Sequence, residues 1–89
     1  MKKNLAVTFI EDSGHGWLRL PKALVESIIL DTPVSTYSYM DRDFIYLEED
    51  CDAPNVQKTL EHIGYEFEIK EQYIDGYCYV RDLPPYQGK

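Results

Sequence analysis

The residues that come closest to a catalytic arrangement lie in one short segment, Asp12–Trp17, which reads DSGHGW. A histidine becomes an effective general base when a carboxylate orients its ring, and Asp12 or Glu11 could orient His15. Ser13 could then act as a nucleophile. Glycines on both sides of the histidine would let the backbone take conformations that other residues avoid, which would expose the imidazole. This composition could therefore support general base or nucleophilic catalysis.

The pattern around the histidine lacks the context that such catalysis needs. It is not the G-x-S-x-G of hydrolases, and it does not precede a long helix in a parallel α/β unit. It is not a phosphate-binding loop, because the third glycine and the lysine are missing. We therefore expect no catalytic residue and no enzymatic activity, and we interpret the segment as a tight turn. Two alternatives stay open: a loop that presents His15 and Trp17 to a partner, and a small-ligand-binding protein or minor enzyme centred on the same loop.

The residues that could bind a metal are scattered along the chain. They form no C-x-x-C or H-x-x-x-H pair, so a zinc site would need four distant residues to converge: His15, Cys51, His62 and Cys78. The segment EEDCD is dense in acids but lacks the glycine and the terminal glutamate of an EF-hand. We expect no metal and no cofactor, and we interpret the segment as an acidic entry to a helix.

The charge balance is the strongest global signal. Sixteen Asp and Glu residues face nine Lys and Arg residues among 89 residues, for a net charge of −7. So acidic a small domain repels nucleic acid and anionic membranes. Its charged partners should therefore be basic proteins, although the acids could also serve solubility alone.

The sequence also bears on location. The N-terminus begins like a signal peptide, but its apolar stretch is short and ends at Glu11. No apolar run approaches the roughly 18 residues that span a bilayer. Two cysteines, Cys51 and Cys78, are too few for a disulfide framework and indicate buried thiols. We expect a cytoplasmic protein that binds no membrane.

Alternating and helical apolar patterns place these residues on a predicted fold. Strands are predicted at 4–10, 17–20, 34–40, 44–49, 65–71 and 77–80, with helices at 21–30 and 53–63. The order β-β-α-β-β-α-β-β predicts one small α+β domain, with a mostly antiparallel sheet of five to six strands and two short helices on one face. We expect residues 1–82 to form this domain and the proline-rich residues 83–89 to fray.

Four local expectations follow from this layout. Trp17 should pack against the first helix, near Leu24 and Ile28. Asp52 should cap the second helix, and Asp75-Gly76 should turn the last hairpin. Tyr37 and Tyr39 alternate along one strand and indicate a partly exposed sheet face. These expectations concern the following positions: Trp17, Leu24, Ile28, Asp52, Asp75, Gly76, Tyr37 and Tyr39.

The blocks DSGHGWLRLP, STYSY and IYLEEDCDA resemble a group of small proteins encoded by phages and other mobile elements. Their shared pattern is D-x-G-H-G-W-L-x-[VL]-P, then S-x-Y-S-Y, then Y-L-E-E-D-C-D. The resemblance covers Asp12–Ala53 and carries no activity, cofactor or catalytic residue with it. It implies an accessory protein that acts in the host cytoplasm, since small acidic phage proteins often bind host machinery or block defence systems.

Charge and resemblance together favour a non-enzymatic binding protein. We expect it to bind a basic surface of a host protein and so to inhibit or modulate a host nucleic-acid-binding complex; imitation of nucleic acid is one way in which it could do so. The expected partner-binding residues are Glu48, Glu49, Asp50, Asp52, Glu66, Glu68, Tyr37 and Tyr39. The remaining alternative is a structural phage component whose sheet edges pair in an oligomer.

Overall fold

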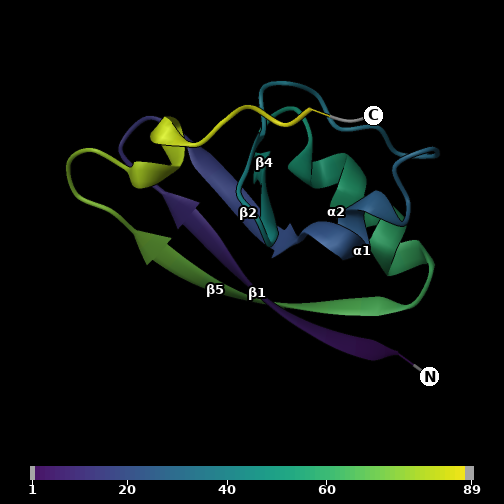
Figure 1. The fold of residues 1–89 in the computed structure, drawn as a ribbon. Coiled ribbons are helices and arrows are strands. Elements are labelled where there is room, and N and C mark those ends of the chain that lie inside the picture. The colour runs from purple at the N-terminus through teal and green to yellow at the C-terminus, as the bar shows by residue number, and fades with distance from the viewer. Residues whose placement is uncertain (1, 88–89) are drawn as a thin grey trace.

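One five-stranded sheet organises the residues that the computed structural model describes, 2–87 (Figure 1). In sheet order, the strands are β3 (Tyr39–Met40), β4 (Phe44–Glu48), β2 (Gly16–Pro21), β1 (Lys3–Glu11) and β5 (Tyr65–Tyr73). The helices are α1 (Lys22–Glu26), α2 (Ala53–His62) and the short 3₁₀ helix η1 (Tyr79–Asp82). The chain is a small single α+β domain, as the sequence predicted.

Three of the four strand pairs are antiparallel, and the fourth is parallel. β1 and β2 form a hairpin, and β2 pairs with β4. β5 instead lies parallel to β1 over nine residue pairs, from Lys3–Tyr65 to Glu11–Tyr73. β5 can run parallel to β1 because α2 carries the chain from the end of β4 back to the end of the sheet where β1 begins. Parallel strands require such a crossover connection.

The main core lies on the sheet face that α1 and α2 cover, here called the helix face. Strand alternation directs every second residue to it, and both helices add an apolar stripe. Its buried residues are Val7, Leu18, Leu20, Val25, Ile28, Ile45, Leu47, Ala53, Val56, Leu60 and Tyr86. At about 25 cal/mol per Å² of apolar surface, this burial is what holds two helices too short to be stable alone.

A second, smaller core covers one end of the opposite face. It joins Ile10, Trp17 and Tyr46 of the sheet to Cys78 and Val80 of residues 77–87, here called the C-terminal segment. That segment lies near the ends of β1 and β5 in Figure 1 (yellow-green to yellow). The prediction that Trp17 packs near Leu24 and Ile28 is therefore wrong. Trp17 pairs with Ile10, so both side chains point to the sheet face opposite the helix face.

The predicted strand 77–80 is also wrong, since η1 occupies its second half, Tyr79 and Val80, and residues 77–78 lie outside any strand. Gly76 has a φ of +89°, so the turn at Asp75-Gly76 does form a tight bend. The chain then crosses the end of the sheet instead of returning beside β5. Burial of Cys78 and Val80, each 0% exposed, stabilises that path.

Three further expectations fail in detail. The first helix ends at Glu26 and continues as turns, with Leu30 96% exposed. The predicted strand 34–40 is reduced to Tyr39–Met40. The tail does not fray at residue 83: Tyr86 is buried and its backbone N–H donates to Ser38 O at 2.7 Å. Residues 88–89 of the predicted tail lie outside the described part of the chain.

No helix within residues 2–87 is long and apolar enough to cross a membrane.

Candidate functional site

The segment that raised the question of catalysis forms the turn between β1 and β2. Asp12 Oδ1 accepts hydrogen bonds from the backbone N–H of Gly14 at 2.9 Å and of His15 at 2.8 Å. Asp12 N in turn donates to His15 O at 2.9 Å. Asp12 therefore stabilises the turn through its own side chain, as aspartates often do. Its carboxylate is not oriented toward the imidazole, as that of a catalytic partner would be.

The same carboxylate binds the C-terminal segment. Arg81 Nε donates to Asp12 Oδ2 at 2.8 Å, and its NH2 group donates to Oδ1 at 3.0 Å. The hydrogen bond from Arg81, followed by those from the backbone of Gly14 and His15, holds the pKa of Asp12 far below its usual range. The guanidinium also lies 5.4 Å from the centroid of the Trp17 ring. Arg81 thus fixes η1 to the turn and covers part of the tryptophan.

Gly14 and Gly16 do not serve the turn through the unusual backbone conformations that the sequence suggested. Within residues 2–87, positive φ angles occur only at Gly64 and Gly76, so neither Gly14 nor Gly16 uses the left-handed region. A Cβ on Gly16 would lie 2.9 Å from Cε2 of Phe9 and closer still to Cζ. Gly16 is needed because the Phe9 ring packs directly against its backbone.

Beside this turn lies a hollow of about 350 Å³, here called the aromatic hollow. Its lining residues are His15, Trp17, Tyr37, Tyr39, Glu48, Asp50, Cys51 and Arg81. The ring centroid of Trp17 is 6.1 Å from that of His15 and 6.2 Å from that of Tyr39. Trp17 is 2% exposed, whereas Tyr37 is 69% exposed, so the tryptophan forms the floor and the tyrosine a wall. Four segments distant in sequence meet here.

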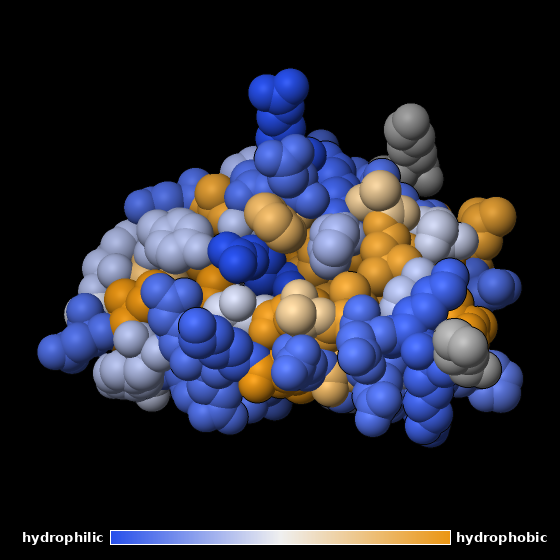
Figure 2. Space-filling model, turned by 90° about the horizontal axis from the view of Figure 1, so that it is seen from below, coloured by the Kyte–Doolittle hydropathy of each residue, from blue (hydrophilic) through white to orange (hydrophobic). Residues whose placement is uncertain are grey.

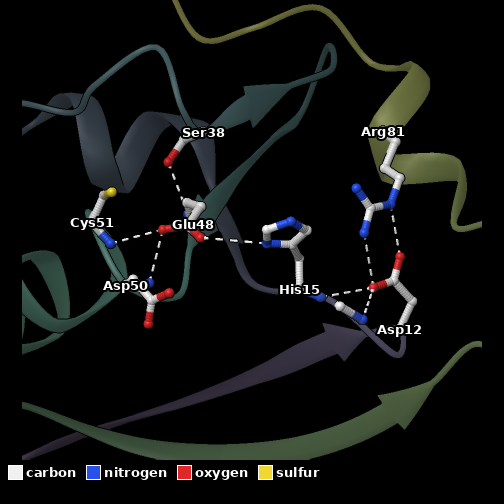
Figure 3. A network of polar contacts seen from close by, with 8 residues as sticks. Asp12, His15, Ser38, Glu48, Asp50, Cys51 and Arg81 are labelled. Carbon is white, nitrogen blue, oxygen red and sulfur yellow. Dashed lines mark hydrogen bonds and ion pairs between the residues drawn. The ribbon is translucent and has the colours of Figure 1, made fainter.

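Glu48 is the acidic centre of the hollow (Figure 3). Its Oε1 accepts the backbone N–H groups of Asp50 and Cys51, both at 2.8 Å. Its Oε2 lies 4.0 Å from Nδ1 of His15, whose imidazole turns toward it in Figure 3. The Glu48 side chain is 13% exposed. It is therefore a fixed carboxylate, held by its own turn, that faces the hollow and the histidine.

The four acids of the EEDCD block diverge instead of forming one patch. Glu48 and Asp50 line the aromatic hollow, and Glu49 lines a separate groove on the helix face with Phe9 and Pro54. Asp52 is 5% exposed. It is therefore not available at the surface, although we expected it to bind a partner there.

Asp52 has an internal role instead. Its carboxylate accepts hydrogen bonds from Ser35 N, Ser35 Oγ and Ser38 Oγ. Asp52 does occupy the N-cap position of α2, as expected, but its side chain makes no capping hydrogen bond there. The Ser38 hydroxyl also accepts the backbone N–H of Glu48 at 2.9 Å. Asp52 thus ties the loop before β3 to the end of β4, which places Tyr37 and Tyr39 beside the hollow.

Glu66 and Glu68 do not join this site. Glu68 pairs with Ala6, four residues along β1 from Ile10, whose row contains Trp17 and Glu48. That offset is roughly 13 Å along the strands, and β5 is three strand spacings, roughly 14 Å, from β4. The separation exceeds the Debye length of about 8 Å at physiological ionic strength, so the two acidic groups act independently in solution.

The nucleophilic side chains in and around the hollow lie in surroundings that disfavour reaction. Cys51 is exposed, but a hydrogen bond to Glu48, with desolvation and nearby acids, raises the pKa of its thiol, which disfavours the reactive thiolate. Ser38 is buried and its hydroxyl is engaged by Asp52 and Glu48. No hydrogen bond joins Ser13 to His15 among the described residues. No group of three His, Cys, Asp or Glu side chains in residues 2–87 could hold a metal ion.

Sequence reasoning missed Arg81, which completes the site from the far end of the chain. The available signal was Asp12, an acid in an apolar hairpin that would need a cation if buried. Nothing in the sequence selects Arg81 over Arg19 or Arg42 as that cation. The indole N–H of Trp17 is buried without a hydrogen-bond partner among the described residues, and we have no physical account of it.

No protein-family model matches this chain, and no curated protein or solved structure is significantly similar to it.

Proposed function

We propose that this protein is a non-enzymatic binding protein whose aromatic hollow receives a cationic side chain of a basic partner protein. The observation that carries the proposal is the meeting of aromatic rings and fixed carboxylates in one hollow. His15, Tyr37 and Tyr39 supply ring surface, and Glu48 and Asp50 supply negative charge. Aromatic faces attract cations, and arginine stacks on them especially well.

The charges around the hollow support a cation rather than an anion. Arg81 is the one basic side chain in its lining, and it is paired with Asp12. Its positive charge is therefore largely balanced, while Asp50 is exposed and hydrogen-bonded only through its backbone N–H among the described residues. The lining therefore holds two carboxylates, Glu48 and Asp50, beside one arginine whose charge Asp12 already balances.

The partner class rests on the charge of the whole chain. A net charge of −7 accelerates association with a basic surface and opposes association with nucleic acid. Host proteins that bind nucleic acid carry such basic surfaces, and the resemblance to proteins of mobile elements supports a host partner. The protein would then compete with nucleic acid for that surface and inhibit or modulate its owner, in the host cytoplasm.

The test is an NMR titration with a short oligo-arginine peptide at two salt concentrations. We expect amide and ring shifts to concentrate at His15, Tyr37 and Tyr39 and to shrink when salt screens the charges. Tyr37→Ala and Asp50→Asn should weaken binding, since both residues lie at the surface of the hollow. Asp31→Asn, which removes one exposed charge elsewhere, is the matched control and should bind like the wild type.

Shifts spread evenly over all acidic residues would contradict the proposal, because they would indicate attraction by net charge without a site. Equal binding by Tyr37→Ala and the wild type would also contradict it. The same variants then serve in a pull-down from host lysate, where a partner retained by Asp31→Asn and lost by Asp50→Asn identifies the natural ligand.

A further inference from the structure

The two edges of the sheet end in different ways. β3 has two residues, and the C-terminal segment covers it through a bridge from Tyr39 to Pro85 and a hydrogen bond from Met40 N to Pro84 O. β5 has nine residues and no proline, and within residues 2–87 it pairs with β1 alone. A long uncovered edge presents unpaired backbone groups to any strand that fits it.

The exposed residues of β5 include large apolar side chains. Ile69 is 44% exposed and Tyr73 is 59% exposed. Ile69 also lines a groove of about 320 Å³ on the helix face, together with Phe9, Leu18 and Pro54. Figure 2 views the molecule from the side of β1 and β5, where hydrophobic residues (orange) are interspersed with hydrophilic ones (blue). The edge is therefore neither uniformly charged nor uniformly apolar.

We propose that β5 pairs antiparallel with β5 of a second copy of this chain, around a two-fold axis at Ile69. The sequence of β5, YEFEIKEQY, is close to self-complementary about that residue. Facing pairs across the axis are Ile69–Ile69, Glu68–Lys70, Phe67–Glu71, Glu66–Gln72 and Tyr65–Tyr73. The product is a continuous ten-stranded sheet with α1 and α2 of both copies on one side, because directly opposed residues of antiparallel strands share a face.

Charge selects this register over its neighbours. Opposite charges face one another at Glu68 and Lys70, twice by symmetry, and no like charges are directly opposed. A shift that moves the axis to Lys70 places two lysines together, and one to Glu68 places two glutamates together. Axes between Ile69 and either neighbour oppose Glu68 to Glu71 or Glu66 to Glu71. Directly opposed like charges destabilise a strand pair, and opposed unlike charges stabilise it.

The same charges explain why the occupant is a second copy. Glu68 and Lys70 face Ala6 and Thr8 of β1, so neither has a charged partner directly across its own sheet. The complement of this strand is the strand itself. The net charge of −7 on each chain opposes association at long range, so we expect the dimer to strengthen as salt rises to physiological levels.

A charge-swap series tests the proposal by sedimentation equilibrium over a range of concentrations. Glu68→Lys and Lys70→Glu should each weaken the dimer about tenfold, because each turns two unlike pairs into two like pairs. The double variant E68K/K70E should regain the wild-type association constant, since it restores both unlike pairs. Glu61→Lys, with the same charge change on exposed α2, is the matched control and should not weaken the dimer.

Amide hydrogen exchange provides the second measurement. Protection of β5 amides should rise with protein concentration in the wild type and in E68K/K70E, whereas protection of β3 should not change. A wild type that stays monomeric at all concentrations and salt levels overturns the proposal. Association without added protection at β5, or a double variant no better than the single ones, overturns it as well.

Discussion

Asp12 and Arg81 lie 69 positions apart and meet through two hydrogen bonds, of 2.8 and 3.0 Å, between the guanidinium and the carboxylate. The Asp12 side chain is 4% exposed, whereas that of Arg81 is 33% exposed. A buried carboxylate with such a partner stays ionised, and its own two backbone hydrogen bonds shape the β1–β2 turn. This pair therefore holds the β1–β2 turn and the C-terminal segment together.

Replacing Arg81 should release the C-terminal segment. Arg81→Ala leaves the Asp12 carboxylate without its cation and uncovers part of Trp17, so we expect a lower melting temperature and altered tryptophan fluorescence. Arg42→Ala, at an exposed arginine, is the control and should change neither. Equal melting temperatures for the two variants would show that the pair contributes nothing to stability.

The Asp12–Arg81 pair should also make stability depend on acid. The folded pKa of Asp12 is lowered, chiefly by Arg81, so its contribution is fully present above the unfolded pKa of about 4 and is lost as pH falls below that value. We expect the wild type to lose melting temperature below about pH 4, and Asp12→Asn to lose less over the same range. Parallel curves for the two proteins would contradict this assignment.

Trp17 should be the costliest aromatic residue to remove. Trp17→Ala should lower the free energy of unfolding by about 3–5 kcal/mol, because it opens a cavity in a small core. Tyr37→Ala should change it by no more than about 0.5 kcal/mol, since Tyr37 is 69% exposed. Urea denaturation measures both, and similar midpoints for the two variants would place Trp17 outside the core.

The two glycines of the turn should respond differently to alanine. At Gly16 the new Cβ would collide with the Phe9 ring, so we expect a loss of about 1–3 kcal/mol. At Gly14 the nearest atom would be Arg81 NH2 at 3.5 Å, an ordinary contact, so Gly14→Ala should cost much less. Thermal melting of the two variants measures both losses. An equal loss at both positions would indicate that backbone conformation, and not the space for a Cβ, sets the cost.

Asp52 and Asp50 should differ although they are two positions apart. Asp52→Ala leaves the donors of Ser35 and Ser38 unpaired in a buried site, and we expect a loss on the order of 2–3 kcal/mol. Asp50→Ala removes an exposed carboxylate and should leave stability within about 0.5 kcal/mol. A stable Asp52→Ala protein would show that the serines find other partners.

The elements that sequence patterns predicted well are those with a single strong period. β1, β4 and α2 were each expected near their observed positions, because alternation or helical spacing runs through most of their length. The segment around Tyr37 was predicted as a strand from its alternation, and the segment around Tyr77 from the turn signal before it, yet Tyr37 lies in a turn and Tyr77 outside any strand. In both segments tertiary burial, of Ser38 against Asp52 and of Cys78 in the second core, overrode the local preference.

The candidate site was harder to predict because its parts are joined through space. Tyr37, Tyr39, Glu48 and Asp50 were expected to bind a partner, and they do line one hollow. Asp52 has the same chemistry in sequence as Asp50, and only the loop that bears Ser35 and Ser38 distinguishes them. Arg81 had no local signal at all, since its role depends on where η1 crosses the sheet.

As far as residue 87, the C-terminal segment adds a single bridge, Tyr39–Pro85, to the sheet and is held mainly by side chains and a few loop hydrogen bonds. Its detachment would remove Tyr86 from the helix-face core but leave the pairing of β1 with β2 and β5, and of β2 with β4, in place. We therefore expect this segment to open locally, at a smaller free energy than the whole domain needs to unfold. A ligand that binds only the closed form would then raise the free energies of local opening and of global unfolding alike, so it would protect the amides of η1 and also those of the central strands.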